Sequence, residues 1–268
     1  MSSVSRSILD FFIVFFVTLS VLAIFVSDVF IFRARSPSYS DQNLPGIIKL
    51  TTEDGSKISA IHYDNPEAKY TVLISHGNAE DVGTTSNFAK QLVKRGFSAL
   101  VYDYYGYGTS EGKPSENNSY KAASAAYNYL VKKKKVEPRS VIAYGHSLGS
   151  ALATYLAATY PVGGLVLEGA FTSTFRVITV IKILPFDKFN TIARIRKVKV
   201  PKLFIHGRED NVVPFWHGEK LFNYSYAPKD NLWVDNASHI NVKQVAPVEY
   251  WKKWEKLVKD MNNFQYQK

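Results

Sequence analysis

Ser147 lies at the centre of the pentapeptide Gly-His-Ser-Leu-Gly, between Gly145 and Gly149. The apolar residues 140 to 144 before it predict a buried strand, and the alanine- and leucine-rich residues 148 to 160 after it predict a helix. A sharp turn from strand to helix lifts the middle hydroxyl clear of a sheet. It needs glycine on both sides because a side chain there would collide with the turn. The spacing therefore predicts that Ser147 is a nucleophile.

A serine hydroxyl is a weak nucleophile near neutral pH, so it needs a base within hydrogen-bonding distance and an acid that orients this base. The chain has six histidines. Of these, His239 alone follows the last predicted strand, residues 231 to 234, where a loop can reach back over the edge of the sheet. We therefore predict that His239 is the base. His217, in the helix after Pro214, is predicted to be a surface residue.

Asp210 is the leading candidate for the acid, because it follows the predicted strand at residues 202 to 205. Glu168, at the end of the preceding strand, is the second candidate, and Glu209 and Asp235 are rivals. A simpler role for Asp210 would be to cap the helix that follows it. With Asp210 as the acid, the three groups occur along the chain in the order serine, aspartate, histidine, which is the order of one large class of hydrolases.

Acyl transfer to serine also needs hydrogen-bond donors for the oxyanion that forms at the substrate carbonyl. The backbone N–H of Leu148 is one predicted donor, since it follows the nucleophile at the start of a helix. The second predicted donor is the N–H of Asn78, in the loop Ser-His-Gly-Asn-Ala at residues 75 to 79. Gly77 allows the backbone of this loop to approach the substrate closely.

Strand-like and helix-like runs alternate along most of the chain. The predicted strands cover residues 47–52, 57–63, 70–75, 97–102, 140–144, 164–167, 202–205 and 231–234, and the predicted helices cover residues 84–95, 120–135, 148–160 and 248–261. Two antiparallel strands followed by six strands linked through helices predict an α/β fold with a mostly parallel, eight-stranded sheet and helices on both faces. Ligands bind at the carboxyl ends of such strands, where the predicted functional residues lie.

The first part of the chain has a different character, since residues 11 to 27 carry no charged side chain and are rich in Phe, Val, Ile and Leu. A helix needs about 20 apolar residues to span a bilayer, and about 17 is near the lower limit. We predict a single-pass membrane anchor at residues 1–35, a linker at 36–45 and one α/β domain at 46–268. A cleaved signal peptide is the main alternative, but no small-x-small cleavage site follows this long run. A buried core helix is a third alternative.

Composition narrows the classes of partner. The 268 residues include no cysteine, which excludes disulfides, thiol chemistry and a cysteine-based metal site. The formal net charge of +10 is scattered and forms no basic stripe with interleaved aromatic residues, so we expect no nucleic-acid partner. This charge is compatible with a weak attraction to anionic lipid headgroups. We expect no cofactor and no metal ion.

Five blocks of the sequence resemble those of the α/β-hydrolase superfamily, and most closely its membrane-anchored abhydrolase-domain branch with the His-Gly-Asn-Ala loop. These blocks are residues 75–79, 103–110, 145–150, 206–210 and 238–239, and the resemblance extends over about residues 45 to 265. It implies the α/β-hydrolase fold and a serine hydrolase. Members of this branch include esterases, lipases, acyl-protein thioesterases and lysophospholipases, and an N-terminal anchor is common among them.

Two positions depart from the pattern of that branch. Tyr105 stands where arginine is usual, which removes the arginine of a supporting salt bridge, and Ser150 stands where a second glycine is frequent. Neither departure removes a predicted catalytic group.

Residues 171 to 198, between the sixth and seventh predicted strands, are apolar nearly all round and end in basic side chains. Packing on the sheet is the simplest interpretation of an apolar helix face. Here, however, the lack of a polar face predicts a small apolar cap over an acyl chain, close to a membrane. We predict that Phe171, Phe175, Ile181 and Phe186 bind the substrate.

These features together predict a membrane-anchored serine hydrolase that cleaves carboxylic ester or thioester bonds of small-molecule, acyl or lipid-like substrates, as an esterase, lipase or thioesterase does. One alternative is a serine peptidase of the aminopeptidase type with the same catalytic groups. Another is a membrane-tethered scaffold that keeps the fold without turnover. The pattern specifies neither the natural substrate nor the side of the membrane, and it leaves the oligomeric state open.

Overall fold

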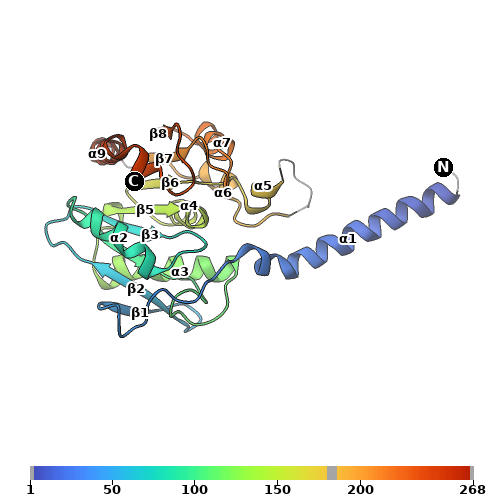
Figure 1. The fold of residues 1–268 in the computed structure, drawn as a ribbon, viewed down its shortest axis with the longest axis horizontal. Coiled ribbons are helices and arrows are strands. Elements are labelled where there is room, and N and C mark those ends of the chain that lie inside the picture. Colours follow the sequence, from blue (N-terminus) through green and yellow to red (C-terminus); the bar gives the residue numbers. More distant parts are fainter. Residues whose placement is uncertain (1–2, 180–185, 266–268) are drawn as a thin grey trace.

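The computed structural model describes residues 3–179 and 186–265. Within them, one eight-stranded sheet has the order β1-β2-β4-β3-β5-β6-β7-β8 (Figure 1). Its strands are β1 (Ile47–Thr51), β2 (Lys57–Tyr63), β3 (Thr71–Ser75), β4 (Ser98–Tyr102), β5 (Val141–His146), β6 (Gly164–Glu168), β7 (Lys202–Gly207) and β8 (Lys229–Val234). β2 pairs antiparallel with β1 and β4, and all other neighbouring strands are parallel. The predicted mostly parallel α/β sheet is confirmed.

The central strands are apolar because they are covered on both faces. All residues of β3, β4 and β6 are buried, as expected for parallel strands between two layers of helices. Such strands lack polar alternation, which is why short continuous apolar runs predict them correctly. The edge hairpin of β1 and β2 is more exposed, and Gly55 in its turn has a φ of +88°, a conformation that favours glycine.

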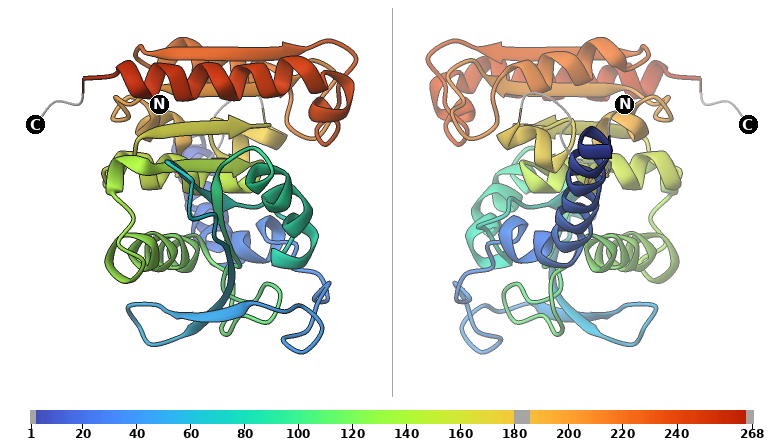
Figure 2. Two further views of the ribbon diagram at one scale, coloured as in Figure 1. Left: turned by 90° about the vertical axis from the view of Figure 1, so that its left-hand side faces the viewer. Right: turned by 90° about the vertical axis from the view of Figure 1, so that its right-hand side faces the viewer.

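Helices cover both faces of the sheet (Figures 1 and 2). α2 (Val82–Val93), α8 (Val242–Val245) and α9 (Pro247–Asn263) pack on one face, and α3 (Glu116–Asn128), α4 (Leu148–Thr159), α6 (Thr191–Ile195) and α7 (Trp216–Tyr224) on the other. A π-helical turn at Tyr129–Lys133 extends α3, a 3₁₀ turn at Pro138–Ser140 precedes β5, and α5 (Thr174–Ile178) follows β6. The helices at both faces match the predicted arrangement.

Two helices begin earlier than predicted because polar caps start them. Asp81 precedes α2 and accepts a hydrogen bond from the backbone N–H of Thr84, whose hydroxyl in turn accepts one from the backbone N–H of Asp81. Ser115 caps α3 by accepting a hydrogen bond from the N–H of Asn118. These caps satisfy N–H groups that have no partner inside the helix. The apolar periodicity that located both helices begins only after these capping turns.

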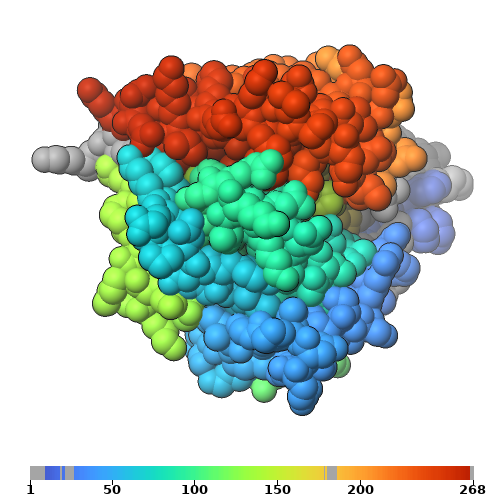
Figure 3. Space-filling model, turned by 60° about the vertical axis from the view of Figure 1, so that its left-hand side comes forward, coloured from blue at the N-terminus to red at the C-terminus, as the bar shows by residue number. Residues whose placement is uncertain are grey.

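α2 and α9 cover the same face of the sheet and pack against each other through aromatic side chains. α9 buries Tyr250, Trp254, Leu257 and Met261, spaced three or four residues apart along one face. The ring of Phe88 in α2 lies 6.5 Å from that of Trp254. Figure 3 shows the two helices side by side, with α9 in red and α2 in green.

The register of the parallel strands brings the predicted functional loops to one edge of the sheet. Ser75 pairs with Gly145, and His146 pairs with Glu168, so the loops after β3, β5 and β6 start side by side. Gly207 pairs with Val234 at the ends of β7 and β8. The carboxyl ends of the strands therefore form one common rim for the site.

α1 (Ser3–Ile31) extends away from the rest of the molecule in Figure 1. Its apolar side chains from Phe11 to Val17 are all exposed by more than two fifths. Among the residues that the structure describes, no helix combines the length and the apolar character needed to cross a membrane. The predicted transmembrane anchor at residues 1–35 is therefore not confirmed by the structure.

The segment predicted as a linker, residues 36–45, contacts the α/β domain closely. The backbone N–H and hydroxyl of Ser38 both donate hydrogen bonds to the carboxylate of Asp81. Tyr39 is buried, and its hydroxyl donates to Asp103. Because these contacts involve the N-cap of α2 and the loop after β4, this segment connects α1 directly to the rim that carries the site.

Candidate active site

Ser147 has the strained backbone expected at a strand-to-helix turn. Its φ is 52° and its ψ −117°, a conformation that residues other than glycine rarely adopt. The neighbouring glycines are required: a Cβ on Gly145 would lie 2.1 Å from the carbonyl oxygen of Gly149, and one on Gly149 would lie 2.0 Å from that of Ser75. The N–H of Ser147 donates to the carbonyl of Glu168 at 2.9 Å, which ties the turn to β6.

His239 and Asp210 are in direct contact, although 29 residues separate them. The Nδ1 atom of His239 lies 2.6 Å from Oδ2 of Asp210, and both side chains are buried. A carboxylate only accepts hydrogen bonds, so Nδ1 carries a proton, and in the neutral ring Nε2 is then the unprotonated nitrogen. His239 therefore has the tautomer that a general base needs.

Asp210 is held as a carboxylate by several donors. Its Oδ1 accepts hydrogen bonds from the N–H groups of Val212 and Val213, at 2.9 and 2.8 Å. Burial alone would raise the pKa of Asp210, but hydrogen bonds from His206 and His239 outweigh it and hold the pKa well below its usual range. Asp210 therefore stays ionised throughout the physiological pH range.

For the other three acids considered from the sequence, no side-chain contact with His239 is found among the described residues. Glu168 is buried, but its Oε2 accepts hydrogen bonds from the hydroxyls of Tyr144 and Tyr250, at 2.8 and 2.7 Å. Glu209 is exposed, and the side chain of Asp235 is 80% exposed and pairs with Arg208. The geometry thus favours Asp210 and gives Glu168 a different set of partners.

The loop after β3 contains the two residues predicted to shape the oxyanion site. Gly77 donates its N–H to the Glu80 carboxylate at 2.6 Å, and the N–H of Glu80 donates to the Gly77 carbonyl at 3.2 Å. The side chain of Asn78 is fixed from α1: its Nδ2 donates to the carbonyl of Ile31 at 2.6 Å, and its Oδ1 accepts from the N–H of Arg33 at 3.0 Å. The hydrogen bonds between Gly77 and Glu80, and those that hold the Asn78 side chain, fix the conformation of this loop.

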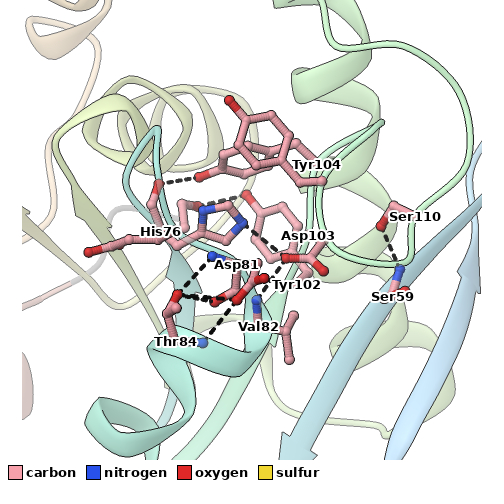
Figure 4. Close-up of polar contacts among 12 residues, drawn as sticks. Ser59, His76, Asp81, Val82, Thr84, Tyr102, Asp103, Tyr104 and Ser110 are labelled. Atoms are coloured by element: carbon pink, nitrogen blue, oxygen red, sulfur yellow. Dashed lines mark hydrogen bonds and ion pairs between the residues drawn. The ribbon is translucent and has the colours of Figure 1, made fainter. Parts of the chain in front are cut away.

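A buried polar network of residues from the loops after β3 and β4 supports the same loop (Figure 4). The His76 ring stacks on Tyr104 with 4.2 Å between ring centroids, and its Nε2 lies 3.2 Å from Asp103. Burial would lower the pKa of His76, but Asp103 outweighs this effect and raises it. Asp103 also accepts a hydrogen bond from the N–H of Val82 at 2.8 Å. His76 therefore shapes the loop, as its position after a strand suggests.

Tyr105, which stands in place of the usual arginine, bonds to the edge hairpin instead. Its hydroxyl donates to Asp54 at 2.8 Å, and Lys121 forms an ion pair with the same carboxylate at 2.9 Å. Tyr105 and Lys121 thus share one carboxylate of the edge hairpin.

Ser147 and His239 both line a cavity of about 720 Å³. Its walls come from the end of α1, the loop after β3, the start of α4, the segment after β6 and the loops after β7 and β8. The lining residues are Ser27, Phe30, Ile31, Arg33, Gly77, Asn78, Ala79, Glu80, His146, Ser147, Leu148, Phe171, Thr174, Phe175, Val177, Val212, Val213, His239 and Ile240. Most of the side chains away from Ser147 are apolar, which suits an apolar ligand group.

The predicted substrate-binding residues differ in their positions. Phe171 and Phe175 line the cavity. Phe186 is not among the described lining residues and instead packs against Phe175, with 5.6 Å between ring centroids. Ile181 lies outside the described residues. α1 contributes Phe30 and Ile31 to the same wall, which the sequence did not predict because no pattern relates α1 to the cap.

His217 is buried rather than exposed, so its prediction as a surface residue is wrong. Its Nδ1 faces the backbone N–H and the hydroxyl of Thr172, at 3.2 and 3.0 Å. Burial lowers the pKa of His217 to about 4. His217 lies in the first turn of α7, where a side chain can point inward or outward. Only the packing of α7 against the segment after β6 decides which of the two it does.

Comparisons with known proteins agree with this fold and site. The family model described as "Serine aminopeptidase, S33" matches residues 66–186. An esterase from Pyrococcus furiosus has the same fold with a TM-score of 0.71 and 20% identity, covering 85% of this chain and 98% of its own. An α/β-hydrolase from Penicillium has a TM-score of 0.70 and 13% identity, covering 82% of this chain and all of its own. The fold is therefore the α/β-hydrolase fold.

Closer relatives identify the family. The chain is 41% identical over 196 residues to α/β-hydrolase domain-containing protein 17B of Xenopus tropicalis, which covers 72% of this chain and 68% of that protein. The human protein of the same name is 40% identical over the same shares of both chains. This chain therefore belongs to the family of α/β-hydrolase domain-containing proteins, and it is a serine hydrolase of that fold.

Proposed function

We propose that this protein hydrolyses carboxylic esters or thioesters of apolar acyl groups, with Ser147 as nucleophile, His239 as general base and Asp210 as the group that orients His239. The observation that carries the proposal is the apolar cavity into which Ser147 and His239 both face. An acyl chain in this cavity would bring its carbonyl carbon to the strained serine at one end.

Acylation follows from the tautomer of His239. The Ser147 oxygen attacks the carbonyl carbon while its proton passes to Nε2 of His239, and Asp210 stabilises the resulting imidazolium. In this proposal the donors to the oxyanion are the backbone N–H groups of Leu148, at the start of α4, and of Asn78, in the loop after β3; both residues line the cavity. Collapse of this intermediate breaks the bond to the leaving alcohol or thiol, which takes the proton from His239.

Deacylation repeats these steps with water as the nucleophile. His239 removes a proton from water, which attacks the acyl-enzyme carbonyl, and the proton then returns to the Ser147 oxygen as the acyl bond breaks. The products are the carboxylic acid and free enzyme.

We further propose that α1 attaches the protein to a membrane. The exposed apolar side chains from Phe11 to Val17 would be poorly solvated in water and favourable in lipid. The other end of α1 lines the cavity, so this one helix would connect the membrane contact with the site. This proposal is tested by flotation with phosphatidylcholine vesicles: the intact protein should float, and a Phe12→Asp/Phe15→Asp variant should stay with the soluble fraction.

The catalytic proposal is tested with a fluorophosphonate probe and a series of acyl esters of increasing chain length. We expect labelling and ester hydrolysis in the intact protein, and loss of both in Ser147→Ala, with rates that rise as the acyl chain lengthens. The name of the matching family model favours a serine aminopeptidase as the second candidate. Aminoacyl amides cleaved faster than any acyl ester would overturn the esterase proposal in favour of this candidate.

A further inference from the structure

His146, next to the nucleophile in the sequence, contacts both of the other loops that form the site. It ends β5, while the loop after β3 contains Gly77 and Asn78 and the loop after β8 contains His239. Among the described strands, β3 pairs with β4 and β5 and β8 pairs with β7, so the two loops follow strands that are not neighbours in the sheet. The His146 side chain is only 13% exposed and lies between them.

On one side, His146 pairs with the loop that carries the proposed oxyanion donor. Its Nδ1 lies 3.4 Å from Oε1 of Glu80, whose Oε2 accepts the N–H of Gly77 at 2.6 Å. The Cβ of an alanine at position 77 would lie 3.0 Å from Nδ1 of His146 and 3.1 Å from Oε2 of Glu80. Gly77 thus allows this close approach, and the contact acts on the residue directly before Asn78.

On the other side, His146 contacts the backbone of the proposed general base. Its Nε2 lies 3.2 Å from the carbonyl oxygen of His239, and the two rings lie 5.1 Å apart with 34° between their planes. A carbonyl and a carboxylate both accept hydrogen bonds, so both ring nitrogens of His146 donate. The contacts therefore require the doubly protonated imidazolium.

The charges around His146 favour this form. Burial alone would lower the pKa of His146, but the Glu80 carboxylate outweighs it and raises the pKa to about 9, with support from Glu168 on β6 and the carbonyl of His239. The remaining charged group among the described residues that line the small cavity beside His146 is Lys243, in α8. Partial burial of Glu80 would raise the pKa of its carboxyl group, but the nearby His146 has a larger effect and lowers this pKa. Ion pairing thus stabilises the charged form of both partners.

We propose that His146 and Glu80 are positioning residues, whose ion pair holds the loop of the oxyanion donor and the loop of His239 at the distance that catalysis needs. This inference rests on the proposed function. Since the contacts need the imidazolium, they are present below the pKa of His146 and are lost as the pH rises through it. Activity should therefore decline in alkaline solution as these contacts are lost.

The test compares His146→Gln and Glu80→Gln with the intact protein, measuring kcat and KM for one acyl ester from about pH 6 to about pH 10. We expect kcat to fall about tenfold in both variants with little change in KM, the loss that corresponds to one hydrogen bond of ordinary strength. The alkaline decline near pH 9 should be absent in His146→Gln and should move to lower pH in Glu80→Gln.

Two matched controls separate positioning from general damage. His62→Gln replaces a half-buried histidine in β2, and Glu67→Gln replaces an exposed glutamate; both should leave kcat and the pH profile as they are. An unchanged kcat and an unchanged alkaline decline in His146→Gln would overturn the inference.

A second measurement does not depend on turnover. The imidazole of His146 is titrated by NMR in Ser147→Ala and in Ser147→Ala/Glu80→Gln. We expect a titration near pH 9 in the first protein and a clearly lower one in the second. A single ordinary titration in both would overturn the ion pair. Absence of both ester hydrolysis and probe labelling in the intact protein, with this titration as expected, would overturn the proposed function but keep the ion pair.

Discussion

The two walls of the cavity are built differently. On the side of His239, a buried aspartate receives hydrogen bonds from a histidine and two backbone N–H groups, directly at the ends of β7 and β8. Elsewhere, α1 and the segment after β6 line the cavity with Phe30, Ile31, Phe171 and Phe175. Outside this lining, the rings of Phe32 and Phe189 lie 5.8 Å apart, and Lys188 forms an ion pair with Asp28 at 2.6 Å. The first wall is fixed by polar contacts at the sheet, whereas the second has a largely apolar lining and depends on packing between separate segments.

Under the proposed function, the two walls would have different tasks. A proton relay needs fixed hydrogen-bond geometry, which buried polar groups on a sheet can supply. An acyl chain needs apolar area and no directional contacts, which a helix end and a cap can supply. We therefore expect changes on the first wall to alter kcat, and changes on the second to alter the selectivity for acyl chains.

The largest effect is expected from Asp210→Asn. The amide would favour the wrong tautomer of His239, so kcat should fall by about 10⁴-fold while the protein remains folded. Glu168→Gln is the matched control, because its carboxylate bonds to Tyr144 and Tyr250 instead, and it should change kcat by less than about tenfold. Steady-state rates for both variants decide the point; the reverse ranking would assign the acid to Glu168.

A smaller and more selective effect is expected from Phe175→Ala. Removal of this ring from the cavity wall should lower kcat/KM for a long-chain ester by about tenfold, the effect of losing a modest apolar contact, and leave an acetate ester nearly unchanged. Phe186→Ala should have a weaker effect, since Phe186 packs behind Phe175. Equal losses for short and long chains would show that the apolar wall does not bind the acyl group.

The smallest effect is expected on the stability of the protein in acid, through the buried His217. Because the pKa of His217 is lowered to about 4, the unfolded chain binds a proton at a pH where the folded chain does not. Stability should therefore fall as the pH decreases from about 6.5, the ordinary histidine value, toward about 4. Protonation would also remove the acceptor for the N–H of Thr172.

His217→Gln should reduce this acid sensitivity, as measured by the urea midpoint at several pH values. Asp210 should contribute little over this range because its low pKa keeps it ionised. If the urea midpoint had the same pH dependence in the intact protein and in His217→Gln, protonation of His217 would not be the cause of the acid sensitivity.

The residues that could be predicted from the sequence are those whose role depends mainly on residues nearby in the chain. Gly145, Ser147 and Gly149 form a turn whose steric needs depend on neighbours in the chain. Asp210 and His239 could be located because each directly follows a buried strand, and parallel strands bring their carboxyl ends to one edge. The boundaries of most strands were predicted within one or two residues for the same reason, since full burial produces unbroken apolar runs.

Tertiary structure alone decided the rest. Nothing near residue 31 in the sequence indicates that the end of α1 would bond to Asn78, and no sequence pattern relates His146 to Glu80. The inward position of His217 likewise depends on how α7 packs. The physical reason is that strand burial and tight turns are encoded by adjacent residues, whereas contacts between segments tens of residues apart arise only when the chain is compact.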